Sequence, residues 1–490
     1  MTEKPKEEGG FDSKWKYGYV STLIMSLFEL AGVLLFLLVM YSTTLSMGSL
    51  SSDDENSFKI MYEQYFQFFI NVTIFALIGF GFVSAYLKYH RWMSIGITLF
   101  IIAFTCQFYI FFSAFWNKCL LGSWEINSKM IVIGLKECLA AMKSTVAILV
   151  TLGALLGKVD ILQVTFLVIF ELFLYTLNEA ILFYSVKVRD MGGCFSIFAF
   201  GSFFGLFASW IYSPKTNCKK NPNNKLCYSG STLAFVGTFF IYIMFPSFNA
   251  VNPLMSTPFS QWNLTELSIQ NTFIALTSSL VFAFISSYLF NLAKFDLFEI
   301  QNATYSAGIM IGACSDMFAY PYPPLLIGAF AGIFTTLGMR ILPNALQRFS
   351  YYDTRKQFFI YGIASIFGMV ASCIACSTLE GNYFGLQSAV VPYMLFGRKA
   401  SVQASIQLAG FAISMGIGSG GGIATGKVFR VFRRYNFPED TFGDHIWWCM
   451  PSESQAIASH NKNSSSIMQF SQSSMIVHPS EEKIFDKSNI

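Results

Sequence analysis

Histidine and charge are both scarce in this sequence. Only 12% of its 490 residues are charged, and only four are histidines, at His90, His445, His460 and His478. All four lie in predicted loops or in the C-terminal tail, outside every long apolar stretch. Histidine is the side chain best suited to carry protons near neutral pH. No histidine is therefore placed to carry protons through the apolar part of the chain.

Long apolar runs place the chain among membrane proteins. Hydrophobic residues make up 54% of it, and runs of about 20 apolar residues, the length that spans a bilayer as a helix, recur along it. The pattern predicts an all-α polytopic membrane protein embedded in a lipid bilayer. A net charge of +4 gives no indication of nucleic-acid binding. The twelve predicted spans are 18–41, 66–87, 93–116, 130–157, 161–186, 192–213, 229–251, 272–292, 300–320, 324–342, 357–379 and 402–426.

Lys and Arg gather in alternate connections between these spans. The positive-inside rule assigns such connections to the cytoplasm, which also places both termini there. The predicted organisation is an N-terminal tail over 1–17, a transmembrane channel domain over 18–427 and a polar cytoplasmic tail over 428–490. The sequon at Asn263 then falls outside, where it is a candidate glycosylation site.

Two motifs resemble functional sites but fit packing better. Residues 421–427 begin like a phosphate-binding loop, but Val428 stands where the metal-binding Ser or Thr is needed. Cys373 and Cys376 form an isolated Cys-x-x-Cys pair inside a span, with no histidine nearby. No nucleophile with a base, metal cluster or phosphate loop is left, so we expect no enzyme, no metal and no other cofactor.

Several short blocks of the chain resemble the Rh glycoproteins, a branch of the ammonium transporter family. These blocks are collinear over about residues 18–450 and lie at 78–82, 153–158, 177–179, 187–193, 245–249, 300–304 and 444–448. The resemblance implies a homotrimer, or a mixed trimer with a relative, in the plasma membrane. Each subunit would carry its own pore, built from two inverted five-helix halves.

The resemblance also implies roles for four residues at the outer mouth of the pore. In the family, acidic residues help to recruit ammonium, and two stacked phenylalanines gate the entrance. Asp190 and Glu179 match the acidic positions, although either carboxylate could instead cap or pin a neighbouring helix. Phe248 matches one gate phenylalanine, and Lys143 replaces the other.

Two aromatic residues stand where the family has facing pore histidines. Phe198 and Tyr361 occupy these positions. A phenyl ring cannot exchange protons, and a tyrosine hydroxyl keeps its proton to about pH 10. A proton relay through the two positions is therefore not available.

Lys143 needs a partner, because an ammonium group inside a bilayer costs about 2.5 to 3.5 kcal/mol unless it is paired or reaches water. We hypothesise an ion pair with Asp190 or Glu179. The alternative is that the side chain extends to the external water with no functional consequence.

The predicted function is transport of ammonium or ammonia through a hydrophobic pore in each subunit. Two alternatives stay open: a channel for another small neutral gas such as carbon dioxide, and a non-conducting subunit with a structural or assembly role. An ion-coupled transporter is a third alternative, since charged residues occur within or near the spans. They are Glu29, Lys136, Glu137, Glu171 and Asp316.

Overall fold

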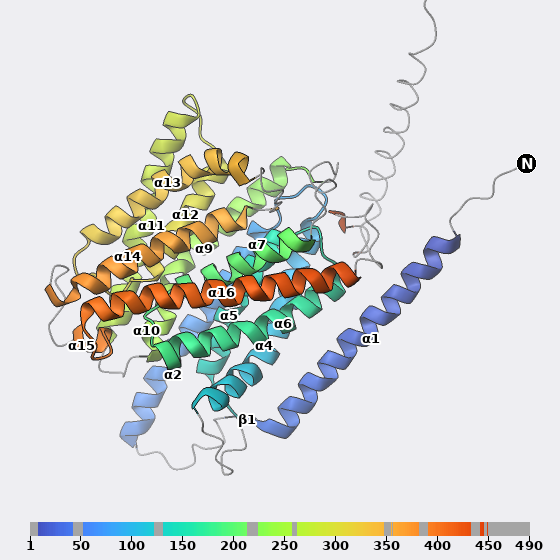
Figure 1. Ribbon diagram of the computed structural model, residues 1–490, viewed down its shortest axis with the longest axis horizontal. Coiled ribbons are helices and arrows are strands. Elements are labelled where there is room, and N and C mark those ends of the chain that lie inside the picture. The colour runs from blue at the N-terminus through green and yellow to red at the C-terminus, as the bar shows by residue number, and fades with distance from the viewer. Residues whose placement is uncertain are drawn as a thin grey trace, which may run out of the picture. The chain divides into compact units, whose positions relative to one another are not determined.

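A computed structural model shows a bundle of long helices (Figure 1). It describes residues 8–42, 52–121, 131–212, 224–256, 262–346, 354, 356–381, 391–432, 442–444 and 448. Within these residues the only paired strands are β1 (Met40–Ser42) and β2 (Ile131–Ile133), which run parallel. The predicted all-α membrane fold is confirmed.

The helices fall into two sets along the chain, with η2, η3, η4 and η7 denoting π-helices. The first set contains α1 (Glu8–Val39), α2 (Ser52–Ile74), η2 (Phe75–Phe80), α3 (Gly81–Val83), α4 (Arg91–Leu121), α5 (Leu135–Leu155), α6 (Ile161–Ala180), η3 (Ile181–Val186), η4 (Cys194–Ala199) and α7 (Phe200–Tyr212). The second set contains α9 (Tyr228–Asn249), α10 (Val251–Ser256), α11 (Trp262–Phe290), α12 (Leu297–Gly312), α13 (Tyr322–Leu346), η7 (Phe358–Ile363), α14 (Ala364–Thr378), the 3-10 turn η8 (Leu379–Gly381), α15 (Val391–Met394) and α16 (Ala400–Phe432).

Eleven helices in the described part of the chain are long and apolar enough to cross a membrane. The twelfth predicted span is the shorter helix α12, which has 16 residues. Every residue of α12 from Glu299 to Gly312 is buried. Because neighbouring helices enclose it, α12 does not need the length of a lipid-facing span.

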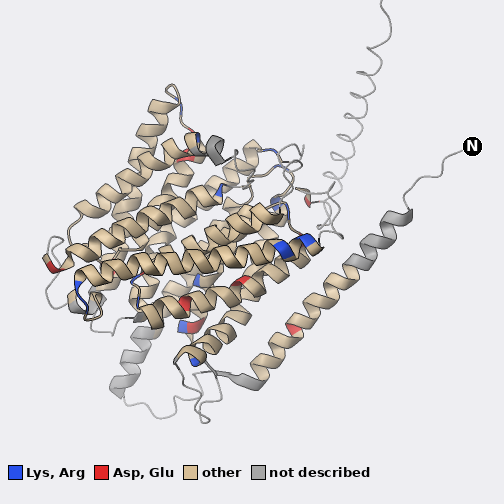
Figure 2. Cartoon of the chain, in the orientation of Figure 1, with Lys and Arg blue, Asp and Glu red and all other residues tan. Residues whose placement is uncertain are grey.

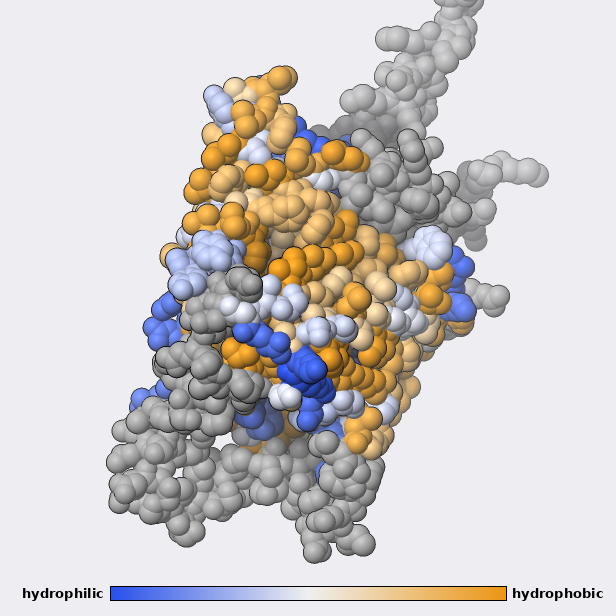
Figure 3. Space-filling model, turned by 60° about the vertical axis from the view of Figure 1, so that its left-hand side comes forward, coloured by the Kyte–Doolittle hydropathy of each residue, from blue (hydrophilic) through white to orange (hydrophobic). Residues whose placement is uncertain are grey.

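The helices differ in how much of their surface faces the surroundings. In α5, 89% of the apolar window is buried, against 11% in α1. Helix α5 therefore belongs to the centre of the bundle and α1 to its edge, as Figure 1 shows. Charged residues are few along the helices (Figure 2), and the described part of the face seen in Figure 3 is largely apolar. A surface of this kind suits a lipid environment.

Close packing explains several glycines of α16, which runs along α6 and α7 (Figure 1), whereas Gly416 and Gly420 have open space around them. A Cβ added at Gly418 would lie 2.7 Å from the Phe200 carbonyl oxygen, and one at Gly422 would lie 2.3 Å from that of Phe204. The glycines thus let two helix backbones approach. Packing, rather than phosphate binding, is their role.

Two π-helices, η4 and η7, begin in the same way in the two halves of the bundle. Gly193 precedes η4 with a φ of 73°, and Lys356 lies at the start of η7 with a φ of 57°. The candidate pore residues Phe198 and Tyr361 each follow the left-handed residue by five positions. This correspondence fits two inverted halves that meet at η4 and η7.

The chain divides into two units at Phe442. Phe442 belongs to the helical unit, where its backbone N–H donates to the Gly157 carbonyl oxygen at 3.0 Å. Helix α16 extends to Phe432, so the predicted tail boundary at residue 428 falls in its last turn. Beyond Phe442 the structure describes only Gly443, Asp444 and Trp448.

Candidate functional site: an aromatic column with a lysine at its outer end

The connection from η3 to η4 shapes one end of the site. Asp190 lies in this connection and is fully buried. One of its carboxylate oxygens accepts hydrogen bonds from the backbone N–H groups of Phe195 and Ser196 and from the Ser196 hydroxyl, at 2.9 to 3.0 Å. Asp190 therefore caps the first turn of η4, where the helix dipole also favours a negative charge. Its predicted part in ammonium recruitment stays a prediction.

Lys143 extends from α5 toward this connection. Its Nζ donates to the Met191 carbonyl oxygen at 3.0 Å and to Asn252 Oδ1 at 2.8 Å. The same nitrogen lies 5.3 Å from the centroid of the Phe248 ring. The Asn252 amide in turn donates to the Asp190 carbonyl oxygen at 2.9 Å.

Both expectations for the partner of Lys143 are wrong. Its hydrogen bonds go to neutral oxygens, so the hypothesised ion pair with Asp190 or Glu179 is not formed. The side chain is only 4% exposed, so it does not extend to external water either. Two carbonyl-type acceptors and a ring face offset the cost of burying the charge.

Glu179 lies at the C-terminal end of α6 and is half-buried. Its Oε2 accepts a hydrogen bond from the Tyr109 hydroxyl of α4 at 2.7 Å. The carboxylate thus joins two neighbouring helices, as the structural alternative from the sequence expected. Its predicted role at the vestibule is not tested by this contact.

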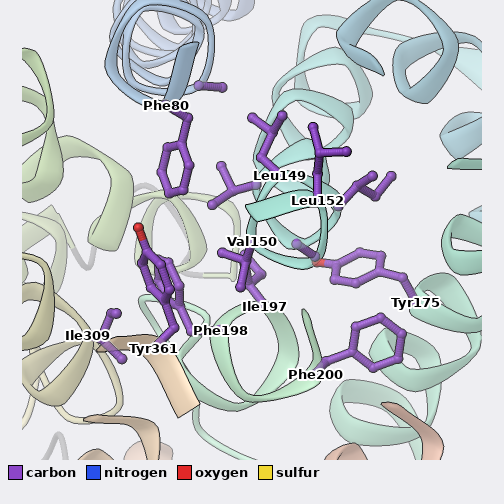
Figure 4. Close-up of a cluster of buried hydrophobic side chains, with 14 of the residues drawn as sticks. Phe80, Leu149, Val150, Leu152, Tyr175, Ile197, Phe198, Phe200, Ile309 and Tyr361 are labelled. Atoms are coloured by element: carbon purple, nitrogen blue, oxygen red, sulfur yellow. The ribbon is translucent and has the colours of Figure 1, made fainter. Parts of the chain in front are cut away.

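Five buried rings form a column inward from Lys143. The column consists of Phe75, Phe248, Phe198, Tyr361 and Tyr305. Phe75 stacks on Phe248 with centroids 4.5 Å apart, and Phe248 lies 5.9 Å from Phe198. The rings of Phe198 and Tyr361 have centroids 5.7 Å apart and are within 5° of parallel. Figure 4 shows the two rings lying face to face. Tyr305 continues the stack 6.2 Å beyond Tyr361.

The inner end of this aromatic column is polar. The Tyr305 hydroxyl lies 2.7 Å from the Thr238 hydroxyl and accepts a hydrogen bond from the Gln301 amide at 2.9 Å. Between the Lys143 ammonium and the Tyr305 hydroxyl, the column presents phenyl faces and the Tyr361 hydroxyl. Its members come from η2, α9, η4, η7 and α12, so both halves contribute.

A second set of contacts fixes the connection that carries Asp190. The Arg189 guanidinium forms a buried ion pair with Asp316, with Nε 2.9 Å from Oδ2. Gln407 of α16 accepts from the Arg189 N–H at 3.0 Å and donates to the Arg189 carbonyl oxygen at 2.6 Å. Arg189 is thus held through both its side chain and its backbone.

The structure brings together Lys143, Phe248, Phe198 and Tyr361, which the sequence singled out. Sequence reasoning missed Asn252 and Tyr305. Asn252 follows Phe248 by four residues but lies in α10 rather than α9, and Tyr305 follows Gln301, which the sequence had not singled out. No motif in the sequence therefore indicated either residue. Asn263 lies in the first turn of α11, but its side chain is outside the described residues, so its glycosylation stays a prediction.

Comparisons with known proteins agree with this architecture. The sequence profile of the Ammonium Transporter Family matches residues 27–436. The chain is 28% identical to ammonium transporter Rh type C of Canis lupus familiaris, over 84% of this chain and 88% of that protein. It is 30% identical to ammonium transporter Rh type B of Mus musculus, over 80% of this chain and 85% of that protein.

The fold is also similar to a solved structure, the Rh50 channel of Nitrosomonas europaea. The TM-score is 0.65 at 19% identity, and the match covers 84% of this chain and 99% of that one. A sensor Amt protein matches with a TM-score of 0.60 at 16% identity, over 78% of this chain and 96% of that chain. With the profile match over most of its length, the chain belongs to the Ammonium Transporter Family, in its Rh branch.

Proposed function

We propose that this protein is a channel that passes ammonia as the neutral molecule along the aromatic column of each subunit. The observation that carries the proposal is the stack of buried rings between η4, η7 and α12. The stack includes Phe198 and Tyr361, the two residues that the resemblance aligns with the pore histidines of the family. The names of the relatives, which are ammonium transporters, support the choice of permeant.

Physical chemistry favours the neutral form in this column. Ring faces offer no relay for a proton, because a phenyl group has no exchangeable hydrogen and a phenol is a weak acid. An ammonium ion would have to lose its water shell without gaining a counter-ion inside the column, which is costly. Proton release outside the column and passage as ammonia avoids this cost.

In this proposal Lys143 controls the outer end of the column. Its ammonium covers the face of Phe248, so entry requires the side chain to leave that position. Asp190 and Glu179 act at the vestibule, the first by holding the start of η4 and the second by adding negative charge. Phe198 and Tyr361 line the conduit.

The proposal places the protein in the plasma membrane with both termini in the cytoplasm. Each subunit is a complete pore within a trimer, formed with copies of itself or with a relative. The apolar surface of the helical unit is compatible with contacts to lipid and to neighbouring subunits (Figure 3).

Stopped-flow measurement of proteoliposomes tests the proposal. With an imposed ammonium gradient and a pH-sensitive dye inside, we expect faster alkalinisation than in empty liposomes of the same lipid. Electrodes on the same preparation should record no current, since a neutral molecule carries no charge. A rate equal to that of empty liposomes would favour the non-conducting subunit. A rate of pH change above that of empty liposomes with a carbon dioxide gradient, but not with an ammonium gradient, would favour the gas alternative.

Replacing Lys143 with Phe tests whether Lys143 restricts entry to the column. Phenylalanine removes the charge and restores a ring at this position, so we expect ammonia flux above that of the wild type in the same liposome assay. Methylammonium uptake in cells gives an independent measurement. If both stay at the wild-type level, Lys143 does not limit conduction.

A further inference from the structure

Two basic connections meet at the end of the bundle where α4 and α9 begin. The first connects α3 to α4 and the second precedes α9, and Leu87 and Leu226 form an antiparallel bridge between them. The Lys88 N–H donates to the Lys225 carbonyl oxygen at 2.9 Å. In this register Lys88 is directly opposite Lys225, so the two side chains start from Cβ atoms that are about 4.5 to 5.5 Å apart.

This pair of like charges has no counter-charge of its own. Lys88 and Lys225 are both exposed, and in the part of the chain that the structure describes neither ammonium forms an ion pair. Lys88 Nζ lies 4.8 Å from the centroid of the Tyr89 ring, which adds no negative charge. The sequence has no Asp or Glu from 64 to 124 or from 191 to 265, so neither connection supplies one. Like charges directly opposite each other repel, and an anion between them would remove the repulsion.

Arg91, the first residue of α4, holds the two connections together. Its Nε donates to the Lys88 carbonyl oxygen at 3.4 Å and its Nη1 to the Ser229 hydroxyl at 3.0 Å. A Cβ added at Gly230 would lie 2.7 Å from the Tyr86 carbonyl oxygen, so the start of α9 packs directly on the first connection. The backbones that carry the two lysines are therefore fixed relative to each other, and Arg91 adds a third positive charge beside them.

Exposed aromatic side chains indicate that this basic pair lies at the surface of the membrane. Trp92, in the first turn of α4, is 54% exposed, and Tyr228, the first residue of α9, is 90% exposed. Both helices are candidate membrane spans. Trp and Tyr are enriched where a span meets the lipid head groups. In the proposed orientation this end faces the cytoplasm, and the cytoplasmic leaflet carries anionic lipids.

We infer that Lys88 and Lys225, with Arg91 beside them, bind the phosphate head group of an anionic membrane lipid. A phosphate monoester carries a charge of about −1.5 to −2 at neutral pH, which matches two facing ammonium groups. A lipid with a monoester phosphate, such as a phosphoinositide, therefore suits the site better than a lipid with a single phosphodiester charge. The inference goes beyond the proposed function, because lipid binding can be measured without any conduction.

Binding to the purified full-length protein in detergent tests the inference. Dioctanoyl phosphatidylinositol 4-phosphate is titrated and its binding is followed by microscale thermophoresis. The double change Lys88→Gln with Lys225→Gln should weaken binding at least tenfold. Lys427→Gln with Arg430→Gln removes the same charge from the end of α16 and should leave the affinity within twofold of the wild type. Equal weakening by the two double variants would overturn the inference, because net charge alone would then explain the binding.

Two further ligands identify the phosphate that is recognised. Dioctanoyl phosphatidylinositol has the same acyl chains and only a phosphodiester, so it should bind at least tenfold more weakly. Inositol 1,4-bisphosphate is the soluble head group, and it should compete only at concentrations at least tenfold above those of the lipid. Competition by this head group or by inorganic phosphate at the same concentration as the lipid would overturn the lipid assignment in favour of a soluble anion.

Charge reversal gives a second measurement, by thermal unfolding. Lys225→Glu places opposite charges across the pair, so the melting temperature of the lipid-free protein should exceed that of the wild type. The lipid should raise the melting temperature of the wild type, since it binds the folded state, and of the matched control Lys427→Glu, but not that of Lys225→Glu. A lipid-free melting temperature of Lys225→Glu below that of the wild type would show that the two lysines do not repel each other, and would overturn the inference.

Discussion

Polar residues inside this apolar bundle are stabilised by contacts with one another, as Lys143 and the Arg189–Asp316 pair illustrate. Thr151 of α5 gives a further example, because its hydroxyl lies within hydrogen-bond distance of two acceptors. These are Glu171 Oε1 of α6 at 2.6 Å and the Gly201 carbonyl oxygen of α7 at 2.8 Å. The one hydroxyl proton is shared between them, so Thr151 joins three helices.

We expect Glu171→Gln to be tolerated, because the amide oxygen can accept from the Thr151 hydroxyl as the carboxyl oxygen does. Glu171→Ala should lower the free energy of unfolding by about 1 to 3 kcal/mol, since it removes a buried hydrogen-bond acceptor. Melting temperatures of the two variants in one detergent give the comparison. A glutamine variant as unstable as the alanine variant would show that the hydrogen bond with Thr151 does not stabilise the fold.

The burial of His90 predicts how the stability of the protein depends on pH. It lies in the connection between α3 and α4, outside the spans, and burial lowers its pKa from 6.5 to about 4. The unfolded chain takes up this proton near pH 6.5 and the folded chain only near pH 4, so stability is full above pH 6.5 and falls as the pH drops toward 4. The difference between the two pKa values corresponds to about 3 kcal/mol.

The melting temperature of the wild type should accordingly fall between pH 6.5 and pH 4 more steeply than that of His90→Leu. The leucine variant controls for the titration of the carboxylates, which both proteins share. Parallel curves for the two proteins would refute this role of His90.

At the scale of helices, hydrophobicity was enough to predict most of the fold. Runs such as that of α5 are long and apolar. In a bilayer, a single such segment can pair its own backbone N–H and C=O groups only by forming a helix. The π-helices and the Arg189–Asp316 pair could not be predicted in this way. Arg189 and Asp316 are 127 residues apart in sequence, so their contact depends on the tertiary fold. Hydrophobicity also did not predict the length of α12. This helix has only 16 residues, because neighbouring helices rather than lipid enclose it.

The Arg189–Asp316 pair should be the contact between elements that is most costly to break. Both side chains are buried, at 3% and 0% exposure. Asp316→Leu leaves an uncompensated guanidinium and should cost about 3 to 5 kcal/mol, whereas the double change Arg189→Leu with Asp316→Leu should recover most of that loss. Unfolding measurements on both single variants and the double variant form a complete cycle. Additive effects would mean that the two residues do not stabilise each other.

On the scale of the whole molecule, the family and the fold follow from blocks that are spread along the chain. The site residues follow less completely. Counting positions from the blocks that resemble the family identified Phe198 and Tyr361, and their rings stack in the structure. The same counting gave Lys143 but not its partners, because Asn252 and Met191 reach it from other parts of the chain.

The proposed topology gives a prediction for the glycosylation of this protein. If both termini lie in the cytoplasm, as we propose, the start of α11 faces outside, and Asn263 is available to the glycosylation machinery. Expression in animal cells should give a band that an endoglycosidase shifts to lower mass, and Asn263→Gln should abolish the shift. A protease-accessible tag at either end of the chain on intact cells would contradict this orientation.

A π-helix such as η4 is related to an α-helix by a single inserted residue. Losing one codon between positions 194 and 197 should restore regular winding and turn the following side chains by about 100°. Phe198 would then leave the stack, although no chemical group in it had been altered. We therefore expect an in-frame deletion of one amino acid here to disturb the column more than many substitutions at the same place.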